Sequence, residues 1–338
     1  SPEALHSALA GPAAVPVVLD ASYFLPAAGR NARNEYANVA RIPGAVFWDL
    51  DAIATPSELP HMLPDAQTLS WACRRASIRS SSDQVVVYDS MGTFSAPRAW
   101  WTLRSFGFSD VLVLDGGLPA WQASGFDARP GSSVAIYADG GDWDRAGDAV
   151  TAASAAGGEL LPGMQRSSTA GAAWTLDQVQ EYARSHCSSD SAGEMVATGP
   201  AALPSLFSAG EAAAGTPAEH ILVDARSAAR FRGEAAEPRA WLPSGHAPGS
   251  VNVPFDSLLV EEASAGTRLL PPDKLRLAFA AAGVDVLAEQ PRVVTTCGSG
   301  ITAAVLSLAL REAGRPEGAT SLFDGSWAEY GAAASQQR

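Results

Sequence analysis

The chain has few cysteines, no run of basic residues and no long apolar stretch. Its 338 residues include only Cys73, Cys187 and Cys297, and neither these nor the five histidines have the spacing of a metal site. An odd number of cysteines is typical of free thiols in a reducing compartment, and it argues against a disulfide framework. No apolar run approaches the roughly 18 residues of a membrane-spanning helix. We therefore expect neither a metal site, nor a disulfide framework, nor a membrane span.

The sequence is also short of positive charge. Its formal net charge is −13 at pH 7. A protein of this charge repels nucleic-acid phosphates, and no cluster of Lys and Arg offers a local exception. We therefore expect no nucleic-acid partner, and an anionic substrate would have to be held by a few individually placed arginines.

Hydrophobic residues, in contrast, make up 47% of the chain. A chain of this length exceeds the size of one typical core, so we expect two domains. The chain begins with Ser1 and not with Met, which is compatible with the removal of a targeting segment.

The first 130 residues alternate short apolar strands with helices. Strands are expected at 15–19, 45–48, 84–88 and 110–114, and helices at 69–77 and 99–106. This alternation implies right-handed crossovers and a mainly parallel sheet with helices on both faces. Residues 1–130 are therefore predicted to form an α/β domain.

Two stretches rich in Ala, Gly, Ser and Asp interrupt the pattern. We interpret 131–173 as a linker and 188–219 as an insertion within the following domain. Between them, Thr175 and Gln178 have the spacing of a capping box, which predicts a helix over 175–184. The second domain is therefore predicted to span 174–338.

The second half repeats the first at a nearly constant distance. Four landmarks recur 204 to 209 residues later, pairing Asp20 with Asp224, Gly44 with Gly249, Asp89 with Cys297, and Asp115 with Asp324. Such a constant offset indicates two copies of one domain. Because only the second copy has a cysteine at its landmark, we expect one catalytic copy and one supporting copy.

Cys297 follows an apolar, β-branched run and begins a glycine-containing loop. Gly298 and Gly300 let the backbone turn so that successive N–H groups can point at the sulfur. The helix expected over 303–311 would present its N-terminus at the same place. Both features favour negative charge on the sulfur and make Cys297 the candidate nucleophile. From the loop alone, a buried thiol at the end of a core strand is an equal alternative.

The segment Cys297-Gly298-Ser299-Gly300-Ile301-Thr302 resembles the CGSG(V/I)T loop of the 3-mercaptopyruvate sulfurtransferases, in the tandem-domain rhodanese family. The thiosulfate enzymes of that family have CRKG(V/I)T instead. The resemblance covers almost the whole chain outside the two low-complexity stretches. It implies two rhodanese-like domains, the first inactive, and a Cys297 persulfide held by Gly298, Gly300, Ile301 and Thr302. Neutral residues at 298 and 299 favour mercaptopyruvate over the compact thiosulfate dianion.

Residues 224–239 resemble the family segment DSRxxGRFRGxxxEPR. The resemblance implies that Arg230 and Arg239 bind the carboxylate and carbonyl oxygens of the substrate, for which a planar guanidinium is well shaped. The alternative is that these arginines lie on a solvated loop or pair with Glu234 and Glu237.

Other matches to the family are expected to be structural. Arg226 follows its strand as Ser22 does in the first copy, and we expect it to pair with a carboxylate near the core. His246 lies in a turn that resembles the family's HIPG and should support the fold. The segments 88–92 and 97–101 resemble the degenerate first-domain loop, where we expect no catalytic residue.

In the first copy, Asp51 and His61 lie in segments that resemble the family's FFDID and DHMLP. The resemblance places both segments opposite the thiol and implies that Asp51, His61 and Ser299 handle protons. The chemistry requires such a group, because loss of sulfur leaves an enolate that must be protonated. An equal alternative is that His61 only packs at the interface.

The resemblance therefore implies a sulfurtransferase that moves sulfur from 3-mercaptopyruvate through Cys297 to thioredoxin, glutathione, another thiol or cyanide, without a cofactor. Thiosulfate sulfurtransferase and a non-catalytic rhodanese-like scaffold are the alternatives. A cysteine phosphatase is disfavoured because Ala303 stands where its loop needs an arginine. Relatives occur in the mitochondrion and the cytosol, and we expect one of these compartments, with a preference for the mitochondrion.

Overall fold

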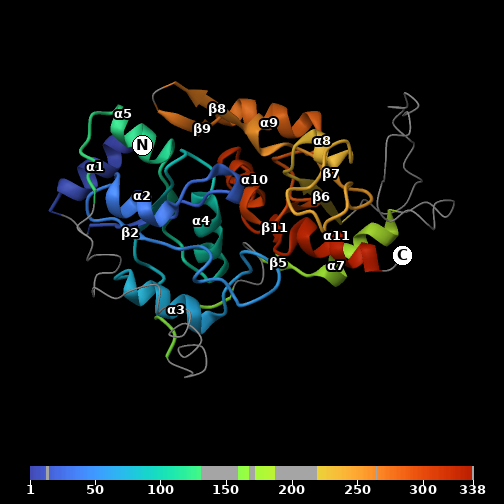
Figure 1. Ribbon diagram of the computed structural model, residues 1–338, viewed down its shortest axis with the longest axis horizontal. Coiled ribbons are helices and arrows are strands. Elements are labelled where there is room, and N and C mark those ends of the chain that lie inside the picture. Colours follow the sequence, from blue (N-terminus) through green and yellow to red (C-terminus); the bar gives the residue numbers. More distant parts are fainter. Residues whose placement is uncertain (13–14, 131–158, 167–171, 187–218, 264, 337–338) are drawn as a thin grey trace.

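The computed structural model describes residues 1–12, 15–130, 159–166, 172–186, 219–263 and 265–336, and Figure 1 draws the rest as a grey trace. Residues 188–218 of the insertion expected at 188–219, and most of the linker expected at 131–173, lie outside the described residues. Of the linker, residues 159–166 and 172–173 are described. Residues 159–166 pack on the first domain, where Leu161 and Met164 are buried in the core and Ser81 N donates to Pro162 O.

The first domain is built on a four-stranded parallel sheet of order β2-β1-β3-β4. Its elements are α1 (Pro2–Ala10), β1 (Val17–Asp20), a 3-10 helix (Pro26–Ala28), α2 (Ala32–Asn38), β2 (Val46–Phe47), α3 (Ala66–Arg75), β3 (Val85–Tyr88), α4 (Ala96–Ser105), β4 (Val111–Val113) and α5 (Gly117–Ala123).

The second domain has a five-stranded parallel sheet of order β5-β11-β10-β6-β7 and a separate antiparallel hairpin, β8-β9. Its elements are β5 (Ala173–Trp174), α7 (Leu176–Ser185), β6 (His220–Asp224), α8 (Ala228–Phe231), β7 (Val251–Asn252), a 3-10 helix (Phe255–Leu258), β8 (Leu259–Glu262), β9 (Gly266–Leu269), α9 (Pro272–Ala281), β10 (Arg292–Thr296), α10 (Ile301–Glu312), β11 (Thr320–Phe323) and α11 (Ser326–Gln336).

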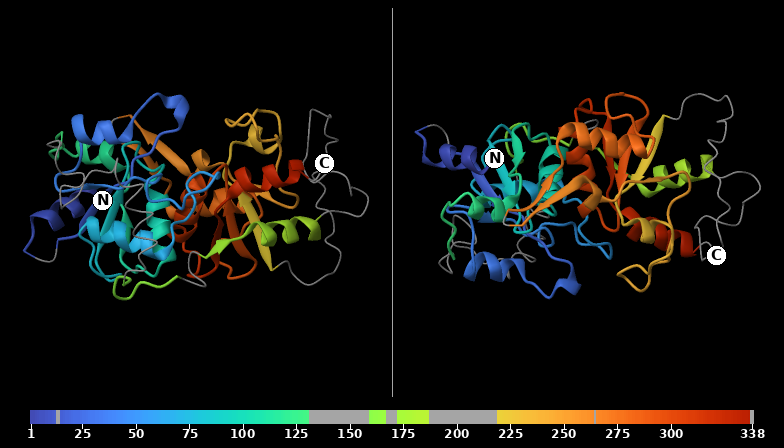
Figure 2. Two further views of the ribbon diagram at one scale, coloured as in Figure 1. Left: turned by 60° about the horizontal axis from the view of Figure 1, so that its bottom comes forward. Right: turned by 90° about the horizontal axis from the view of Figure 1, so that it is seen from above.

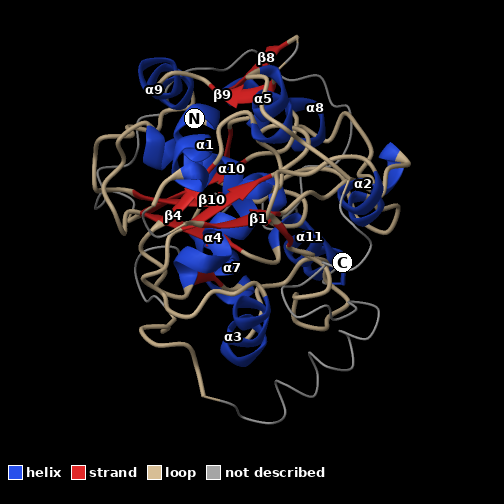
Figure 3. Ribbon diagram, turned by 90° about the vertical axis from the view of Figure 1, so that its left-hand side faces the viewer, coloured by secondary structure: helices blue, strands red, loops and turns tan. Residues whose placement is uncertain are grey.

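The predicted α/β fold with two parallel sheets and helices on both faces is confirmed, as Figure 3 shows for the helices around the central strands. The strands lie at nearly the predicted positions. Helices α3 and α4 begin three residues earlier than predicted, because their starts depend on polar caps and prolines and not on apolar spacing. The side chain of Asp65 caps α3, and Pro97 lies in the first turn of α4. Helix α7 has the capping box predicted from Thr175 and Gln178.

Helices α4 and α10 pack against each other where the two domains meet (Figures 1 and 2). Each follows a strand flanked on both sides within its sheet, β3 in the first domain and β10 in the second. Both helices are buried along almost their whole length. Helix α10 is apolar on most of its surface, as expected of a buried helix, whereas α4 is buried together with the polar residues Arg98, Thr102 and Ser105. One continuous core contains Val87 of the first domain and Val293 and Leu306 of the second. Burial of each such side chain stabilises the fold by about 1.5–3 kcal/mol.

The hairpin β8-β9 extends from the second domain onto the first. Thr267 N donates to Met91 O over 3.3 Å, and Thr93 N donates to Thr267 Oγ1 over 3.2 Å. Among the described helices the longest is α10, with 12 residues, and none is both long and apolar enough to span a bilayer.

Candidate active site

Cys297 lies directly after β10, the middle strand of the second sheet, and is 2% exposed. Its sulfur accepts a hydrogen bond from Gly300 N at 3.1 Å, and its own N–H donates to Ser326 Oγ at 3.1 Å. The carbonyl of Cys297 accepts from Trp327 N, at the start of α11. The thiol is thus fixed between the start of α10, which follows Gly300, and the start of α11.

Of the two loop glycines, Gly300 is required by its backbone conformation. It has a φ of +85°, and a Cβ there would lie 2.6 Å from Arg98 Nη1. At Gly298, a Cβ would lie 3.1 Å from Arg230 Nη2, the end of a side chain that can move. Arg230 therefore lies beside the loop. Within the same loop Ser299 and Ile301 are buried, and Thr302 is half-buried.

The matching loop of the first domain is filled by a carboxylate. Asp89 follows β3 as Cys297 follows β10, and its two oxygens accept five backbone N–H groups at 2.9 Å, from Met91, Gly92, Phe94, Ser95 and Ala96. The loop after the middle strand of this fold is therefore an anion cradle. In the first copy the chain's own side chain occupies it, whereas in the second copy the cradle faces a sulfur atom.

Arg226 is paired within the core, as expected. The residue is 1% exposed. Its guanidinium binds the Asp224 carboxylate at 2.6 Å and Glu237 Oε1 at 2.9 Å. It also donates to Gly245 O and lies over the ring of Trp327. His246 has a structural position too, since its Nδ1 lies 2.7 Å from a backbone carbonyl of the second domain.

Arg230 combines the two interpretations that the sequence left open. Its Nε and Nη2 lie 3.1 and 2.5 Å from the carboxylate of Glu237, so the ion pair considered as an alternative is formed. Glu234 pairs instead with Arg232. The Arg230 guanidinium nevertheless reaches Gly298 and remains partly exposed. It can therefore bind an anion beside the thiol without leaving Glu237.

Arg239 lies close to Tyr23 of the first domain. Burial raises the pKa of Tyr23, the nearby Asp51 carboxylate raises it further, and the charge of Arg239 opposes both. Arg239 is half-buried, and its guanidinium has no hydrogen bond or ion pair with the residues that the structure describes. It is thus a free cation near the boundary between the domains.

The structure brings Asp51 and His61 together. His61 Nδ1 lies 2.5 Å from Asp51 Oδ1, and the imidazole packs edge-on against Tyr23, with 4.7 Å between ring centroids. The imidazole is buried, and neither ring nitrogen has a well-aligned hydrogen bond to a described residue. The close contact with Asp51 is therefore off the direction of a straight hydrogen bond. His61 has a φ of +59°.

Arg98 of α4 was not predicted as part of the site. Its buried guanidinium donates to the carbonyls of Gly300 and His61, and Nη2 lies 2.6 Å from Asp324 Oδ1. Asp324 in turn accepts from Leu63 N at 2.7 Å. One arginine of the first domain thus ties the thiol loop to the segment that contains His61. Its signal in the sequence was an arginine between the apolar residues Ala96, Pro97 and Ala99.

Ser326 was missed as well. It has a φ of +52°, is fully buried, and connects Cys297 N to Phe323 O through its hydroxyl group. No cluster of three metal-ligating side chains occurs among the described residues. The structure thus shows a thiol that accepts a loop N–H, with Arg230 beside the loop. The first domain contributes a contact between an imidazole and a carboxylate, and Arg98 connects the His61 carbonyl to the loop.

By its fold and site, this chain is thus a two-domain α/β protein with one thiol site, at the end of the middle strand of its second sheet. The chain belongs to the rhodanese family, because the family described as "Rhodanese-like domain" matches residues 1–124 and 208–333.

Several known proteins are similar to this chain over most of its length. The chain is 35% identical to "Thiosulfate/3-mercaptopyruvate sulfurtransferase 1, mitochondrial" of Arabidopsis thaliana, over 93% of this chain and 71% of that protein. It is 33% identical to the 3-mercaptopyruvate sulfurtransferase of Escherichia coli (strain K12), over 90% of this chain and 85% of that protein. The crystal structure of SseA from Escherichia coli, described as a 3-mercaptopyruvate sulfotransferase with a rhodanese fold, superposes with a TM-score of 0.65 at 29% identity. The superposition covers 97% of this chain and 98% of the SseA chain.

Proposed function

We propose that this protein is a 3-mercaptopyruvate sulfurtransferase that carries sulfur as a persulfide on Cys297. The observation that carries the proposal is the hydrogen bond from Gly300 N to Cys297 Sγ, in a loop whose counterpart binds the carboxylate of Asp89 through five N–H groups. A persulfide anion needs such a cradle. Support also comes from relatives of that name at 30–38% identity over most of the chain.

In the first half-reaction the Cys297 thiolate attacks the sulfur atom of 3-mercaptopyruvate. A sulfur–sulfur bond forms and the carbon–sulfur bond breaks, and its electron pair passes to the carbon chain as the enolate of pyruvate. Arg230 and Arg239 are proposed to bind the carboxylate and carbonyl oxygens, because a guanidinium can donate two parallel hydrogen bonds to them. The N–H groups that precede and begin α10, from Gly298 to Thr302, stabilise the new persulfide.

The enolate then takes a proton to become pyruvate. His61, Asp51 and Ser299 are proposed to move protons at this stage. The support for the first two is the 2.5 Å contact between His61 Nδ1 and Asp51, and Ser299 lies inside the thiol loop. Arg98 binds both the His61 carbonyl and the carbonyl of Gly300 in the thiol loop. We propose that it thereby holds His61 at a fixed position relative to the Cys297 sulfur.

In the second half-reaction an acceptor removes the outer sulfur and frees the Cys297 thiolate. We propose a small or protein thiol as the natural acceptor, such as glutathione or thioredoxin, with cyanide as a convenient substitute. The mitochondrion and the cytosol both suit free thiols. The relatives include one named as mitochondrial and others from a bacterium.

Thiosulfate is a second candidate donor. The names of two Arabidopsis relatives include it, and Arg230 Nη2 lies beside Gly298, where it places a cation near the loop. Neutral Gly298 and Ser299 favour mercaptopyruvate, because they leave no cationic side chain within the loop itself for a compact dianion.

Steady-state assays with cyanide as acceptor test the proposal and separate the two donors. Thiocyanate is measured with each donor, and pyruvate is measured with 3-mercaptopyruvate. We expect a higher kcat/KM with 3-mercaptopyruvate and stoichiometric release of pyruvate. A preference for thiosulfate would replace the proposed donor, and an absence of turnover with both donors would favour the non-catalytic scaffold.

A further inference from the structure

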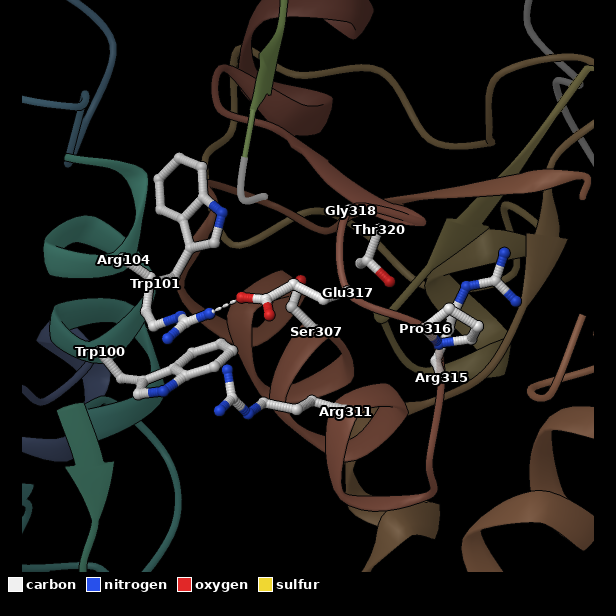
Figure 4. Close-up of a pocket in the computed structure, with 10 residues that line it drawn as sticks. All are labelled: Trp100, Trp101, Arg104, Ser307, Arg311, Arg315, Pro316, Glu317, Gly318 and Thr320. Atoms are coloured by element: carbon white, nitrogen blue, oxygen red, sulfur yellow. Dashed lines mark hydrogen bonds and ion pairs between the residues drawn. The ribbon is translucent and has the colours of Figure 1, made fainter. Parts of the chain in front are cut away.

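A cavity lies at the boundary between the domains, away from Cys297. It has a volume of about 250 Å³ and opens between the carboxyl-terminal parts of α4 and α10 and the segment 315–320 that leads into β11 (Figure 4). Thr320, the first residue of β11, pairs with Val293 of β10, four residues before Cys297. The cavity is therefore at the amino ends of the strands, about 13 Å along β10 from the thiol loop.

Two tryptophans of α4 form one wall of this cavity. Trp100 is 6% exposed and Trp101 is 2% exposed. The indole N–H of Trp101 is buried and has no hydrogen-bond acceptor among the described residues. A buried donor without a partner is unfavourable, so a ligand that supplies an acceptor would gain a hydrogen bond there.

Two arginines face the same space from the two domains, Arg104 from α4 and Arg311 from α10. Arg104 binds Ser109 O and the carboxylate of Glu317, whose side chain is 70% exposed. Burial lowers the pKa of Arg104, and the charge of Arg311 lowers it further, so the two guanidinium groups are close enough to repel each other.

The guanidinium of Arg311 has no hydrogen bond or ion pair with the residues that the structure describes. It instead lies 5.9 Å from the ring centroid of Trp100. The third arginine at the cavity, Arg315, is already committed, because it donates to three backbone carbonyls at 2.6 to 3.1 Å. The cavity therefore has one cation without a counter-charge and a second cation, Arg104, whose counter-charge among the described residues is the exposed Glu317.

We propose that this interdomain cavity binds a small aromatic carboxylate. An apolar cavity of about 150 Å³ is large enough for benzene, so the volume here suits one ring with a carboxylate. The carboxylate would lie between Arg104 and Arg311, displace Glu317 and accept the indole N–H of Trp101. The ring would stack on the indole of Trp100.

Benzoate is the probe for this site, and the ¹H–¹⁵N resonance of the Trp101 indole, assigned through Trp101→Phe, is the readout. Titration of the full chain should shift this resonance in a saturable way. Acetate lacks the ring and benzyl alcohol lacks the charge, and each should bind at least tenfold more weakly. If benzoate does not move the Trp101 resonance, or if either partial probe binds equally well, the proposed site is wrong.

Single substitutions separate this site from the candidate active site. Arg311→Gln should weaken benzoate binding at least tenfold, and Glu317→Gln should strengthen it severalfold because the competing carboxylate is removed. Arg129→Gln is the matched control, since Arg129 is exposed, pairs with Asp127 and lies outside the cavity. Arg239→Gln should leave the shift unchanged. Equal affinities of the Arg311 and Arg129 variants would contradict the proposal, as would loss of the shift in the Arg239 variant.

Discussion

Single residues determine which of the two anion cradles can react. Asp89 and Cys297 follow equivalent strands, and each begins the loop that leads into a buried helix. Five loop N–H groups donate to the Asp89 carboxylate, and the N–H of Gly300 donates to the Cys297 sulfur. A carboxylate has its negative charge built in and fills its cradle permanently. A thiolate leaves its cradle available for one more sulfur atom. Of the two copies, only the second therefore has a nucleophilic side chain at this position.

The position of Arg239 predicts a role in substrate binding. Arg239→Gln should lower kcat/KM for 3-mercaptopyruvate about ten- to hundredfold, mainly through KM, because a charge-assisted hydrogen bond is worth about 1.5–3 kcal/mol. Steady-state kinetics with cyanide as acceptor measure this. Arg232→Gln is the control, since Arg232 is exposed and pairs with Glu234. Equal effects of the two substitutions would argue that Arg239 does not contact the substrate.

Gly300 is predicted to tolerate no side chain. With a φ of +85° and Arg98 Nη1 2.6 Å from a Cβ, Gly300→Ala should cost about 1–3 kcal/mol of unfolding free energy and lower kcat. Denaturant unfolding and steady-state assays measure the two effects. Gly125→Ala is a matched control, because Gly125 has a φ of +78° but no atom near its Cβ. Its kcat should be unchanged. A fully active Gly300→Ala enzyme would show that the loop adapts.

At the scale of elements, parallel strands place their polar ends at one edge of each sheet. β1 ends at Asp20 and lies beside β3, which is followed by Asp89. The pKa of Asp20 is raised to about 6. Burial is the main cause and the charge of Asp89 adds to it, whereas the hydrogen bonds from Ser22 and Tyr88 lower the pKa. The folded state therefore binds a proton at Asp20 more tightly than the unfolded state does.

This raised pKa predicts a specific pH dependence. The stabilising effect of the proton on Asp20 is fully present below about pH 4 and is lost as the pH rises through about 6. The free energy of unfolding of the unsubstituted protein, relative to that of Asp20→Asn, should therefore fall by up to about 3 kcal/mol between pH 4 and pH 7. Denaturant unfolding at both pH values measures this difference. A constant difference across that range would contradict the raised pKa.

The sequence predicts these elements well where the information is local. The apolar runs located β1, β3 and β10, and the spacing of Thr175 and Gln178 located the start of α7. The hairpin β8-β9 was not predicted, because neither strand alternates clearly between apolar and polar residues, and the hairpin is held by contacts with Met91 and Thr93 far away in the sequence.

The candidate site was predictable only in part, for the same reason. The thiol loop and the arginine segment are short motifs that can be found in one stretch of sequence. Arg98 and Asp324 are separated by 226 residues and meet only when the domains pack together. The pairing of Arg230 with Glu237 was considered, but sequence spacing could not show that the same guanidinium also reaches Gly298.

At the scale of the whole molecule, the two copies form one continuous core with the candidate site at their boundary. The first domain contributes Tyr23, Asp51, His61 and Arg98, and the second contributes the thiol and Arg230. In the first copy the loop N–H groups are occupied by Asp89, yet this domain supplies side chains to the candidate site of the second.

The buried pair of Arg98 and Asp324 should couple the domains. Arg98→Met should cost about 3–5 kcal/mol of unfolding free energy, because it leaves a buried carboxylate without its partner. The double variant Arg98→Met/Asp324→Asn should be less destabilised than the sum of the single variants by at least about 1 kcal/mol. Arg184→Met is the control. Because Arg184 forms an exposed ion pair with Glu181, its replacement should change the unfolding free energy little. Strict additivity would indicate that the two groups act independently.

The most direct test of the central claim is the mass of the protein after incubation with 3-mercaptopyruvate without an acceptor, followed by peptide mapping of its cysteines. We predict one added sulfur atom per chain, located on Cys297, removed by cyanide and absent from Cys297→Ser. Cys73 should carry none, because it is fully buried and burial raises the pKa of its thiol. An unmodified Cys297, or sulfur that persists in Cys297→Ser, would contradict the account.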